Sequence, residues 1–113
     1  MSASEKAIEA EIQAKNLNAP RLTPDYIDSV IACEYVGRAS DQFAGAPMVD
    51  AMKCLTICVL VLQNGFTVVG KSACASPENF DAELGAKIAK EDARRQIWAL
   101  EGYALRNRLK AAE

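Results

Sequence analysis

The segment 55–69 constrains the fold of this chain more than any other part of the sequence. It contains two runs rich in β-branched residues, 55–62 and 66–69, which predict two β-strands. Between them lies Asn64-Gly65, a dipeptide typical of the two-residue type I′ turn of a β-hairpin. The sequence therefore predicts an antiparallel hairpin in this segment.

A two-residue turn also predicts the register of the hairpin. It places Val61 opposite Val68, and it puts Leu60 on the same face as Val69. The first strand is apolar on both faces, and an isolated two-stranded ribbon is marginally stable. We therefore expect helices to cover one face, and a third strand or a second subunit to cover the other face and the free edge.

The N-terminal region is predicted to form a helical arm, residues 1–20. A helix over 3–17 begins with Ser4 as a possible cap and ends before a turn. Its apolar stripe is thin, because it consists of Ile8, Ile12 and, at its end, Leu17. Such a helix buries little by itself, so we expect it either to dock on a partner subunit or to fray.

A second helix is predicted to start at Thr23, with Pro24 in its first turn. Its amphipathic pattern extends to about Tyr35 or Gly37. Beyond it the sequence has no period and contains several turn-forming residues. We expect residues 38–53 to form a surface loop.

The last helix is predicted to begin at Ser76-Pro77 and to reach about Ala112. An unbroken helix of roughly 37 residues would measure about 55 Å, whereas a domain of this size has a radius of gyration of about 13 Å. The helix must therefore protrude, or kink near residues 99–102. Its expected core stripe consists of Phe80, Leu84, Ile88, Ala89, Ala93 and Ile97.

These elements together predict an α+β fold in a single domain, residues 1–113. N-terminal helices, an antiparallel hairpin and a long, kinked C-terminal helix form the expected protomer. The uncovered hairpin face and the long helix both favour an oligomer.

The composition excludes several classes of function. The chain has 13 basic and 15 acidic side chains, a net charge of −2 and no histidine. Tight binding to DNA or RNA is not expected without a basic run. Ser-His-Asp triads are excluded, and the commonest metal ligand is missing. No apolar stretch is long enough to span a bilayer and the N-terminus lacks a signal-peptide core, so we expect a cytoplasmic protein without membrane contact.

Four cysteines, Cys33, Cys54, Cys58 and Cys74, form an even set. They would suggest disulfides in a secreted chain, but three of them lie in the apolar segment, where cysteine behaves as a small buried residue. Cys54 and Cys58 are separated by roughly 13 Å if they lie on one strand, too far for a shared metal. We expect reduced structural thiols, with a functional role as the alternative.

Arg94 and Arg95 are candidate ligand-binding residues on the last helix. Two adjacent arginines beside apolar helix faces can donate bidentate hydrogen bonds to a phosphate. The alternative is structural, because Glu91 and Arg95 form a favourable i,i+4 pair. The adjacent carboxylates Glu91 and Asp92 point in different directions on a helix, so they do not form an acid/base pair.

Phe66 and Asn79 are further candidates with structural alternatives. Phe66 follows the hairpin turn, where it could stack on a planar ligand or pack in the core. Asn79 lies near a helix start, where it could contact an anion or make a local turn bond. We identify no catalytic residue, no metal site and no cofactor, and we expect a protein that is not an enzyme.

The C-terminal half of the chain resembles a known phage family. The order of its motifs is similar to that of the phage gene-product-forty-nine family (phage N-four Gp forty-nine / phage Sf-six gene sixty-six family), over about residues 23–109. The stretches that carry the resemblance are 55–60, 64–68, 72–81, 89–98 and 100–103.

This family is also similar to the sponge proteins of phages that defeat Thoeris immunity. The resemblance implies obligate dimers, or hexamers built from them, that hold cyclic ADP-ribose isomers, and in some cases cyclic di- or trinucleotides, at subunit interfaces. It further implies that Phe66 stacks on adenine and that Arg94 holds the pyrophosphate, with Arg38 as a second phosphate contact. Sponges of this kind carry an acid after that arginine, where this chain has Arg95.

We therefore expect a phage anti-defence protein that sequesters a nucleotide second messenger in the host cytoplasm, as a homodimer or homohexamer. The alternative is a phage accessory protein that binds a host protein. The first hypothesis requires Phe66 and Arg94 to converge on an open cleft. The second predicts Arg94 paired with Glu91 or Asp92 at the surface. Hydrolysis of the messenger is disfavoured, because no histidine base or metal cluster is present.

Overall fold

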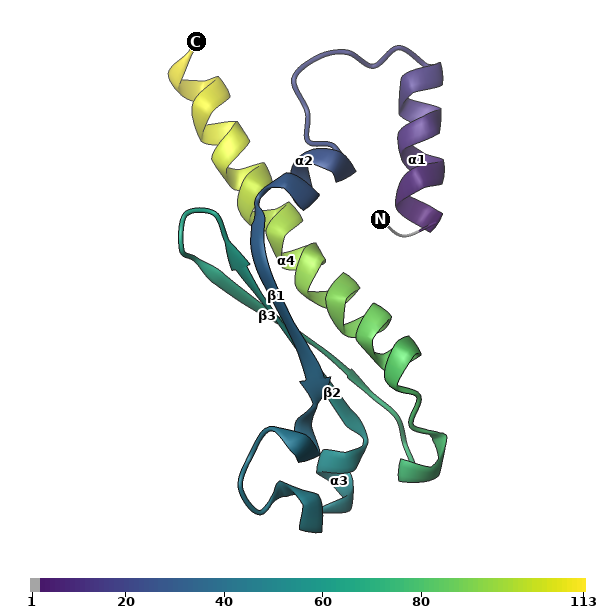
Figure 1. Ribbon diagram of the computed structural model, residues 1–113. Helices are drawn as coiled ribbons and strands as arrows, with labels where there is room; N and C mark the ends of the chain where they lie inside the picture. The colour runs from purple at the N-terminus through teal and green to yellow at the C-terminus, as the bar shows by residue number, and fades with distance from the viewer. Residues whose placement is uncertain (1–2) are drawn as a thin grey trace.

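The computed structural model describes residues 3–113 and has an α+β fold, in which a long helix lies along a three-stranded sheet (Figure 1). The elements in chain order are α1 (Ala3–Ala14), α2 (Pro24–Ser29), β1 (Ile31–Arg38), two short 3₁₀ turns (Ala39–Asp41 and Ala46–Met48), α3 (Asp50–Lys53), β2 (Leu55–Leu62), β3 (Thr67–Ala73), a third 3₁₀ turn (Pro77–Asn79) and α4 (Ala82–Ala111). The predicted fold class is confirmed. Among residues 3–113, no helix is both long and apolar enough to cross a membrane.

The sheet is antiparallel with strand order β1-β2-β3, so β2 lies in the centre. Helix α2 begins as predicted, because the Thr23 side chain accepts a hydrogen bond from the backbone N–H of Tyr26 at 3.1 Å and Pro24 occupies the first turn. The predicted end of this helix near Tyr35 is wrong, since α2 stops at Ser29 and β1 begins at Ile31. The edge of β2 supplies backbone partners to residues 31–38, and this pairing prevails over a weak helical pattern.

The hairpin between β2 and β3 forms, but the predicted turn type and register are wrong. Its loop has three residues, 63–65, with Gly65 at φ 88°. The Leu62 N–H donates to the Phe66 carbonyl at 2.8 Å, and the Gly65 N–H donates to the Leu62 carbonyl at 2.9 Å. This geometry is the three-residue hairpin loop with glycine in the left-handed region.

The longer loop shifts the pairing by one residue, so that Leu60 pairs with Val68 and Cys58 pairs with Gly70. A shift of one residue moves every side chain of a strand to the other face. Val68 therefore faces the core together with Leu60, whereas Val69 is 53% exposed on the opposite face.

Helix α4 begins later than predicted. Ser76-Pro77 starts only a 3₁₀ turn, which the extended backbone of Phe80 terminates. Asp81 is the actual N-cap, because its side chain accepts a hydrogen bond from the Leu84 N–H at 3.0 Å. The helix then continues for 30 residues. It protrudes rather than breaks, which gives the protein its elongated shape, 56 × 30 × 19 Å (Figure 1).

The core lies between α4 and one face of the sheet. Its helix side is a stripe formed by Ala89, Ala93 and Ile97, all fully buried. Gly70 permits close packing, because a Cβ atom at this position would lie 2.1 Å from the Ala89 carbonyl oxygen. The sheet side and α2 contribute Ile27, Cys58, Leu60, Leu62 and Val68.

Three of the six residues expected in the core stripe of the last helix, Phe80, Leu84 and Ile88, are not buried in the core. Leu84 and Ile88 are 56% and 46% exposed. They lie toward the edge of β3 rather than beneath the sheet, because the close contact runs along the alanine stripe.

The segment 38–53 is more ordered than a surface loop, since it contains two 3₁₀ turns and α3 and buries Ala39 and Ala46. Helix α1 is shorter than predicted, and Ser4 lies within it rather than at a cap. No residue of α1 is buried. It docks against its own chain through polar contacts that are described below.

Candidate functional site

One face of the sheet turns away from α4 and carries apolar side chains. Along β2, buried residues alternate with half-buried ones, and the half-buried set points away from the helix. Strand pairing places Tyr35 opposite Val59, and Tyr35 is 63% exposed. We call this surface the open face. It is formed by Cys33, Tyr35, Ile57, Val59, Val61 and Val69.

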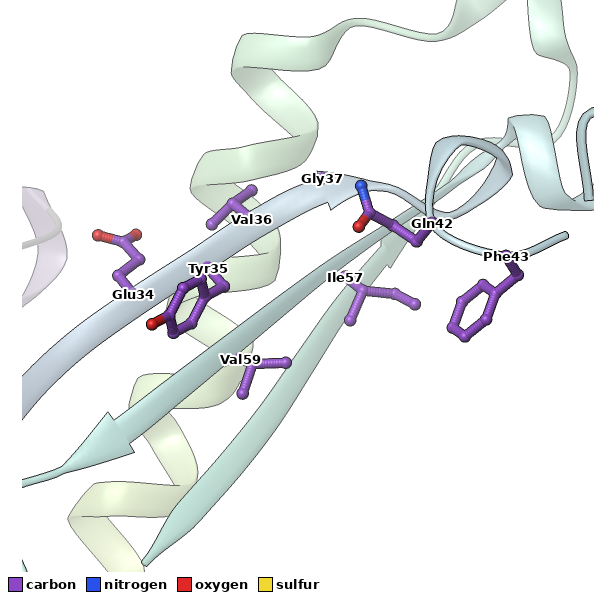
Figure 2. A pocket seen from close by; sticks show the side chains of 8 residues that line it. All are labelled: Glu34, Tyr35, Val36, Gly37, Gln42, Phe43, Ile57 and Val59. Atoms are coloured by element: carbon purple, nitrogen blue, oxygen red, sulfur yellow. The ribbon is translucent and has the colours of Figure 1, made fainter. Parts of the chain in front are cut away.

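The open face is hollowed where β1 runs into the segment 38–53. The hollow has a volume of about 560 Å³. Figure 2 shows Tyr35, Ile57 and Val59 gathered over the strands, with Phe43 at the far end. Its lining residues are Glu34, Tyr35, Val36, Gly37, Gln42, Phe43, Ile57 and Val59.

A glycine in β1 shapes one wall of this hollow. A Cβ atom on Gly37 would lie 2.5 Å from the side-chain nitrogen of Gln42. The missing side chain lets the Gln42 amide lie over the strand, at the rim of the hollow (Figure 2). Phe43, the next residue, is 54% exposed. The hollow is thus built from two aromatic side chains, one amide and the Glu34 carboxylate around an apolar floor.

The chemistry of the lining suits a planar, weakly charged group. Tyr35 and Phe43 offer ring faces for stacking, and the Gln42 amide can both donate and accept hydrogen bonds. The lining includes no lysine or arginine. A phosphate bound here would therefore need a cation from outside the hollow.

Arg38 and Asn79 lie close together at the α4 N-terminal end of the sheet. The Arg38 guanidinium stacks on the Phe80 ring at 3.9 Å and its Nε donates to the Lys53 carbonyl at 2.6 Å. Two smaller cavities flank Phe80, of which one is lined by Arg38 and the other by Asn79, and Thr56 lines both. The structure brings these two candidate residues together, but away from the other three.

Arg94 is buried beneath the N-terminal helices and is only 3% exposed. Its Nη1 donates to the Glu5 carboxylate at 2.7 Å, and its Nε donates to the Asp28 carboxylate at 3.1 Å. The indole Nε1 of Trp98 donates to the same Glu5 carboxylate at 3.0 Å. Arg94 therefore lies neither at an open cleft nor in a surface pair with Glu91 or Asp92, the two arrangements considered from the sequence.

Arg95 and Phe66 are both accessible. Arg95 pairs with Asp92 at 2.9 Å, not with Glu91 as the i,i+4 spacing suggested, and its side chain is 68% exposed. Asp92 also accepts a hydrogen bond from the Lys71 backbone N–H at 2.9 Å. That bond, and then the Arg95 contact, lower the pKa of Asp92. Phe66 is 55% exposed at the hairpin tip, so packing in the core is excluded.

The cysteines are free thiols in the described chain. Cys54 and Cys74 lie opposite each other just beyond the β2–β3 ladder, where the Cys74 N–H donates to the Cys54 carbonyl at 3.1 Å. Burial, and then the neighbouring Cys74 thiol, raise the pKa of Cys54. Within residues 3–113, no three histidine, cysteine or acidic side chains are grouped as a metal site would require.

Comparison of the sequence with known protein families identifies one match. The sequence pattern described as "Phage protein (N4 Gp49/phage Sf6 gene 66) family" matches residues 22–109. The chain belongs to this family. No curated protein and no solved structure is significantly similar to it. The N4 Gp49/Sf6 gene 66 region contains the sheet, its open face and α4, whereas α1 lies outside it.

The residues of the hollow were missed from the sequence. Tyr35 was assigned to a helix and Phe43 to a featureless loop, so neither was considered as a site residue. The β-branched and aromatic residues within 30–36, Val30, Ile31, Tyr35 and Val36, were the available signal for a strand. The Glu5–Trp98 contact had no local signal, because the two residues are 93 positions apart.

Proposed function

We propose that this member of the N4 Gp49/Sf6 gene 66 family is an anti-defence protein that acts in the host cytoplasm. It binds and sequesters a nucleotide second messenger, a cyclic ADP-ribose isomer or a cyclic oligonucleotide, without cleaving it. The observation that carries the proposal is the aromatic hollow on the open face. Its volume of about 560 Å³ falls in the range typical of small-molecule sites.

The ligand is held between two subunits in this proposal. The open face exposes a continuous apolar surface, which a second copy can cover in a homodimer, and dimers can assemble further into a hexamer. The hollow lacks a cation of its own. In the dimer, the exposed Arg95 and Phe66 of one subunit are available to a ligand seated on the other. A nucleobase stacks on Tyr35, and arginine contacts the phosphates.

Arg38 keeps its proposed role as a second phosphate contact, with Asn79 beside it. Its guanidinium is already oriented by the Phe80 ring and the Lys53 carbonyl. An arginine held in this way loses little conformational freedom when it binds an anion.

A second candidate function is binding of a host protein, with no small-molecule ligand. The exposed apolar side chains of the open face favour it as well, because contiguous apolar patches mark protein interaction sites. The engagement of Arg94 by Glu5 and Asp28 also favours it, since that arginine is not available at a cleft.

A thermal-shift screen separates these two functions. The protein is heated with cyclic ADP-ribose isomers and with cyclic di- and trinucleotides, and ligand released by heat is analysed by mass spectrometry. A ligand present at 100 times its dissociation constant stabilises the folded state by about 2.7 kcal/mol. Sequestration predicts a raised Tm and recovery of the intact ligand.

Two variants test whether the ligand-induced rise in Tm comes from binding in the hollow. Tyr35→Ala abolishes the ligand-induced shift, whereas Tyr103→Ala, at a site on α4 that is 73% exposed, preserves it. A cleaved ligand would contradict sequestration. If no nucleotide raises the Tm, the result favours the host-protein function. A pull-down from host lysate, with the wild-type protein and with Tyr35→Ala, then tests that function.

A further inference from the structure

Two cysteines lie opposite each other at the end of the sheet where β2 begins and β3 ends. The pairing of these strands continues one step beyond Leu55 and Ala73, because the Cys74 N–H donates to the Cys54 carbonyl at 3.1 Å. Residues directly opposite in a hydrogen-bonded antiparallel pair have Cα atoms about 5.5 Å apart. A disulfide spans Cα separations of about 4.4–6.8 Å. The backbone thus already holds Cys54 and Cys74 at a separation that suits a disulfide.

Both side chains point to the same side of the sheet. Thr56 pairs with Ser72 two positions along the strands, and residues two positions apart on a strand share a face. These two residues line a cavity of about 170 Å³ together with Cys54 and Cys74. Burial, and then a hydrogen bond with the Cys74 side chain, raise the pKa of the Cys54 thiol. The two thiols are therefore neighbours in one cavity.

The two thiols differ in accessibility. Cys54 is 8% exposed, whereas Cys74 is half-buried. The Cys74 thiol donates to the Ser76 carbonyl at 3.3 Å, a weak contact that a reagent can replace. Cys74 is therefore the thiol that a small reagent reaches first, and Cys54 is the buried partner that can react with it afterwards.

The other two cysteines have no such partner. Cys33 lies opposite Val61, and Cys58 lies between Val36 and Gly70 on the neighbouring strands. Within residues 3–113, strand pairing therefore brings only Cys54 and Cys74 directly opposite each other. The remaining cysteines serve as internal controls for any test of this pair.

We propose that Cys54 and Cys74 are a reversible dithiol–disulfide pair, a site of oxidation by low-molecular-weight disulfides of the glutathione type. The Cys74 thiolate attacks one sulfur of the oxidant, the S–S bond breaks, and a thiolate leaves and takes up a proton. The Cys54 thiolate then attacks the Cys74 sulfur of this mixed disulfide and displaces the second thiol. The two cysteines lose two electrons and two protons, and the oxidant becomes two thiols. The pair needs no nucleotide, so this inference goes beyond the proposed function.

Oxidation changes the turn that follows β3. The hydrogen that the Cys74 thiol donates to the Ser76 carbonyl is lost, and a covalent bond joins the turn to Cys54 at the end of α3. The same turn leads to Phe80, on which the Arg38 guanidinium stacks. Disulfides in a reducing compartment are usually transient or redox-sensing. The pair is thus reduced in such a compartment and closes when low-molecular-weight disulfides accumulate.

The dependence on glutathione concentration tests the pair in the wild-type protein. The folded protein is equilibrated with reduced and oxidised glutathione, free thiols are blocked by alkylation, and peptides are analysed by mass spectrometry. Formation of the internal disulfide releases two molecules of reduced glutathione, whereas a mixed disulfide releases one. A tenfold increase in both glutathione concentrations should therefore lower the ratio of Cys54–Cys74 disulfide to dithiol about tenfold. The mixed disulfide of the exposed Cys33 should stay unchanged.

Cys54→Ala removes the second thiol of the pair. In this variant Cys74 should stop at the mixed disulfide with glutathione, and its amount should depend only on the ratio of oxidised to reduced glutathione. Cys58→Ala, at another buried position of β2, is the matched control and should still form the Cys54–Cys74 disulfide. Oxidation should raise the Tm of the wild type by at least about 5 °C, because the bond closes a loop in the unfolded chain, and should not raise that of Cys54→Ala.

Three results would overturn the proposal. The pair could stay reduced at every ratio of oxidised to reduced glutathione, or Cys74 of the wild type could stop at the mixed disulfide. A disulfide that forms but lowers the Tm would show that the native fold does not accommodate the bond. Each of these results leaves nucleotide sequestration untouched, because the thermal-shift screen is carried out on the reduced protein.

Discussion

The two faces of the sheet are equally apolar along β2, but the chain covers only one of them. Facing α4, Cys58 and Leu60 are fully buried against a stripe of alanines and Ile97. On the open face, Val59 is only half-buried and Tyr35 is 63% exposed. Burial therefore alternates along β2, although both faces of this strand carry mostly apolar residues.

The two faces differ at the point where the helix crosses the sheet. On the covered face small residues lie at this crossing, Gly70 on the strand and Ala89 and Ala93 on the helix, so the two backbones approach closely. The open face presents large side chains that no element of the described chain packs against. One face is covered by a helix of the same chain, whereas the other is left uncovered by residues 3–113.

Gly70→Val is the largest expected disruption of the covered face. Its Cβ would lie 2.1 Å from the Ala89 carbonyl oxygen and 2.3 Å from the Ala93 nitrogen, and backbone atoms of a helix cannot move aside singly. We expect a loss of at least about 3 kcal/mol in the free energy of unfolding. Urea denaturation measures it. Val69→Ala, one residue away on the open face, is the control and should cost less than about 1 kcal/mol.

Leu60→Ala and Val59→Ala compare the two faces at adjacent positions. Leu60 is fully buried, so its truncation should cost about 2–5 kcal/mol. Val59 faces the hollow, and its truncation should cost less than about 1 kcal/mol in the monomer. Denaturation is measured at nanomolar protein concentration, so that the monomer is the species that unfolds. Equal losses there would show that both faces are covered within one chain.

Tyr35→Asp tests the open face as a subunit interface. A charge at this exposed position should change the stability of the monomer by only about 0.5 kcal/mol. It should nevertheless shift the oligomer toward monomer, because a buried unpaired charge is costly at an interface. Light scattering coupled to size-exclusion chromatography reports the mass. Tyr103→Asp is the control. If the Tyr35→Asp variant still forms the oligomer, the interface does not lie on the open face.

The cysteines give the smallest effect, a difference in labelling rate without a change in stability. Cys33 is exposed on the open face, while Cys58 is fully buried beneath it. Burial, and then the nearby Glu34, raise the pKa of Cys58, so its thiolate is scarce at pH 8. Iodoacetamide should modify Cys33 first, and raising the pH should accelerate Cys58 only above the usual thiol range. Peptide mass spectrometry follows both, and equally fast labelling of Cys58 would contradict its burial.

Local signals in the sequence were sufficient for several elements. Thr23-Pro24 marked the start of α2, the two β-branched runs marked β2 and β3, and the long helical pattern marked α4. A third strand was one of the two solutions expected for the other face and the free edge of the hairpin, and β1 forms at that edge, while the face itself stays uncovered in the described chain. These features depend on residues that are close together in the chain, which is why they could be predicted.

The failures have a different origin. Strand β1 forms because the edge of β2 offers backbone partners, although its own residues also fit a helix. The hairpin register depended on one extra loop residue, which Asn64-Gly65 accommodates as readily as the shorter turn. The site predictions for Phe66, Arg95, Arg38 and Asn79 remain predictions. The structure places Arg38 and Asn79 beside Phe80, away from Phe66 and Arg95.

The sequence by itself determined the α+β class, the apolar central strand, the long helix and the family, because each depends on local pattern or on the order of motifs. Only the tertiary structure decided which face of the sheet is left open and what surrounds Arg94. Those outcomes depend on contacts between distant residues, such as Gly70 with Ala89 and Glu5 with Arg94. Their free energies come from packing and charge pairing that no local segment of the chain contains.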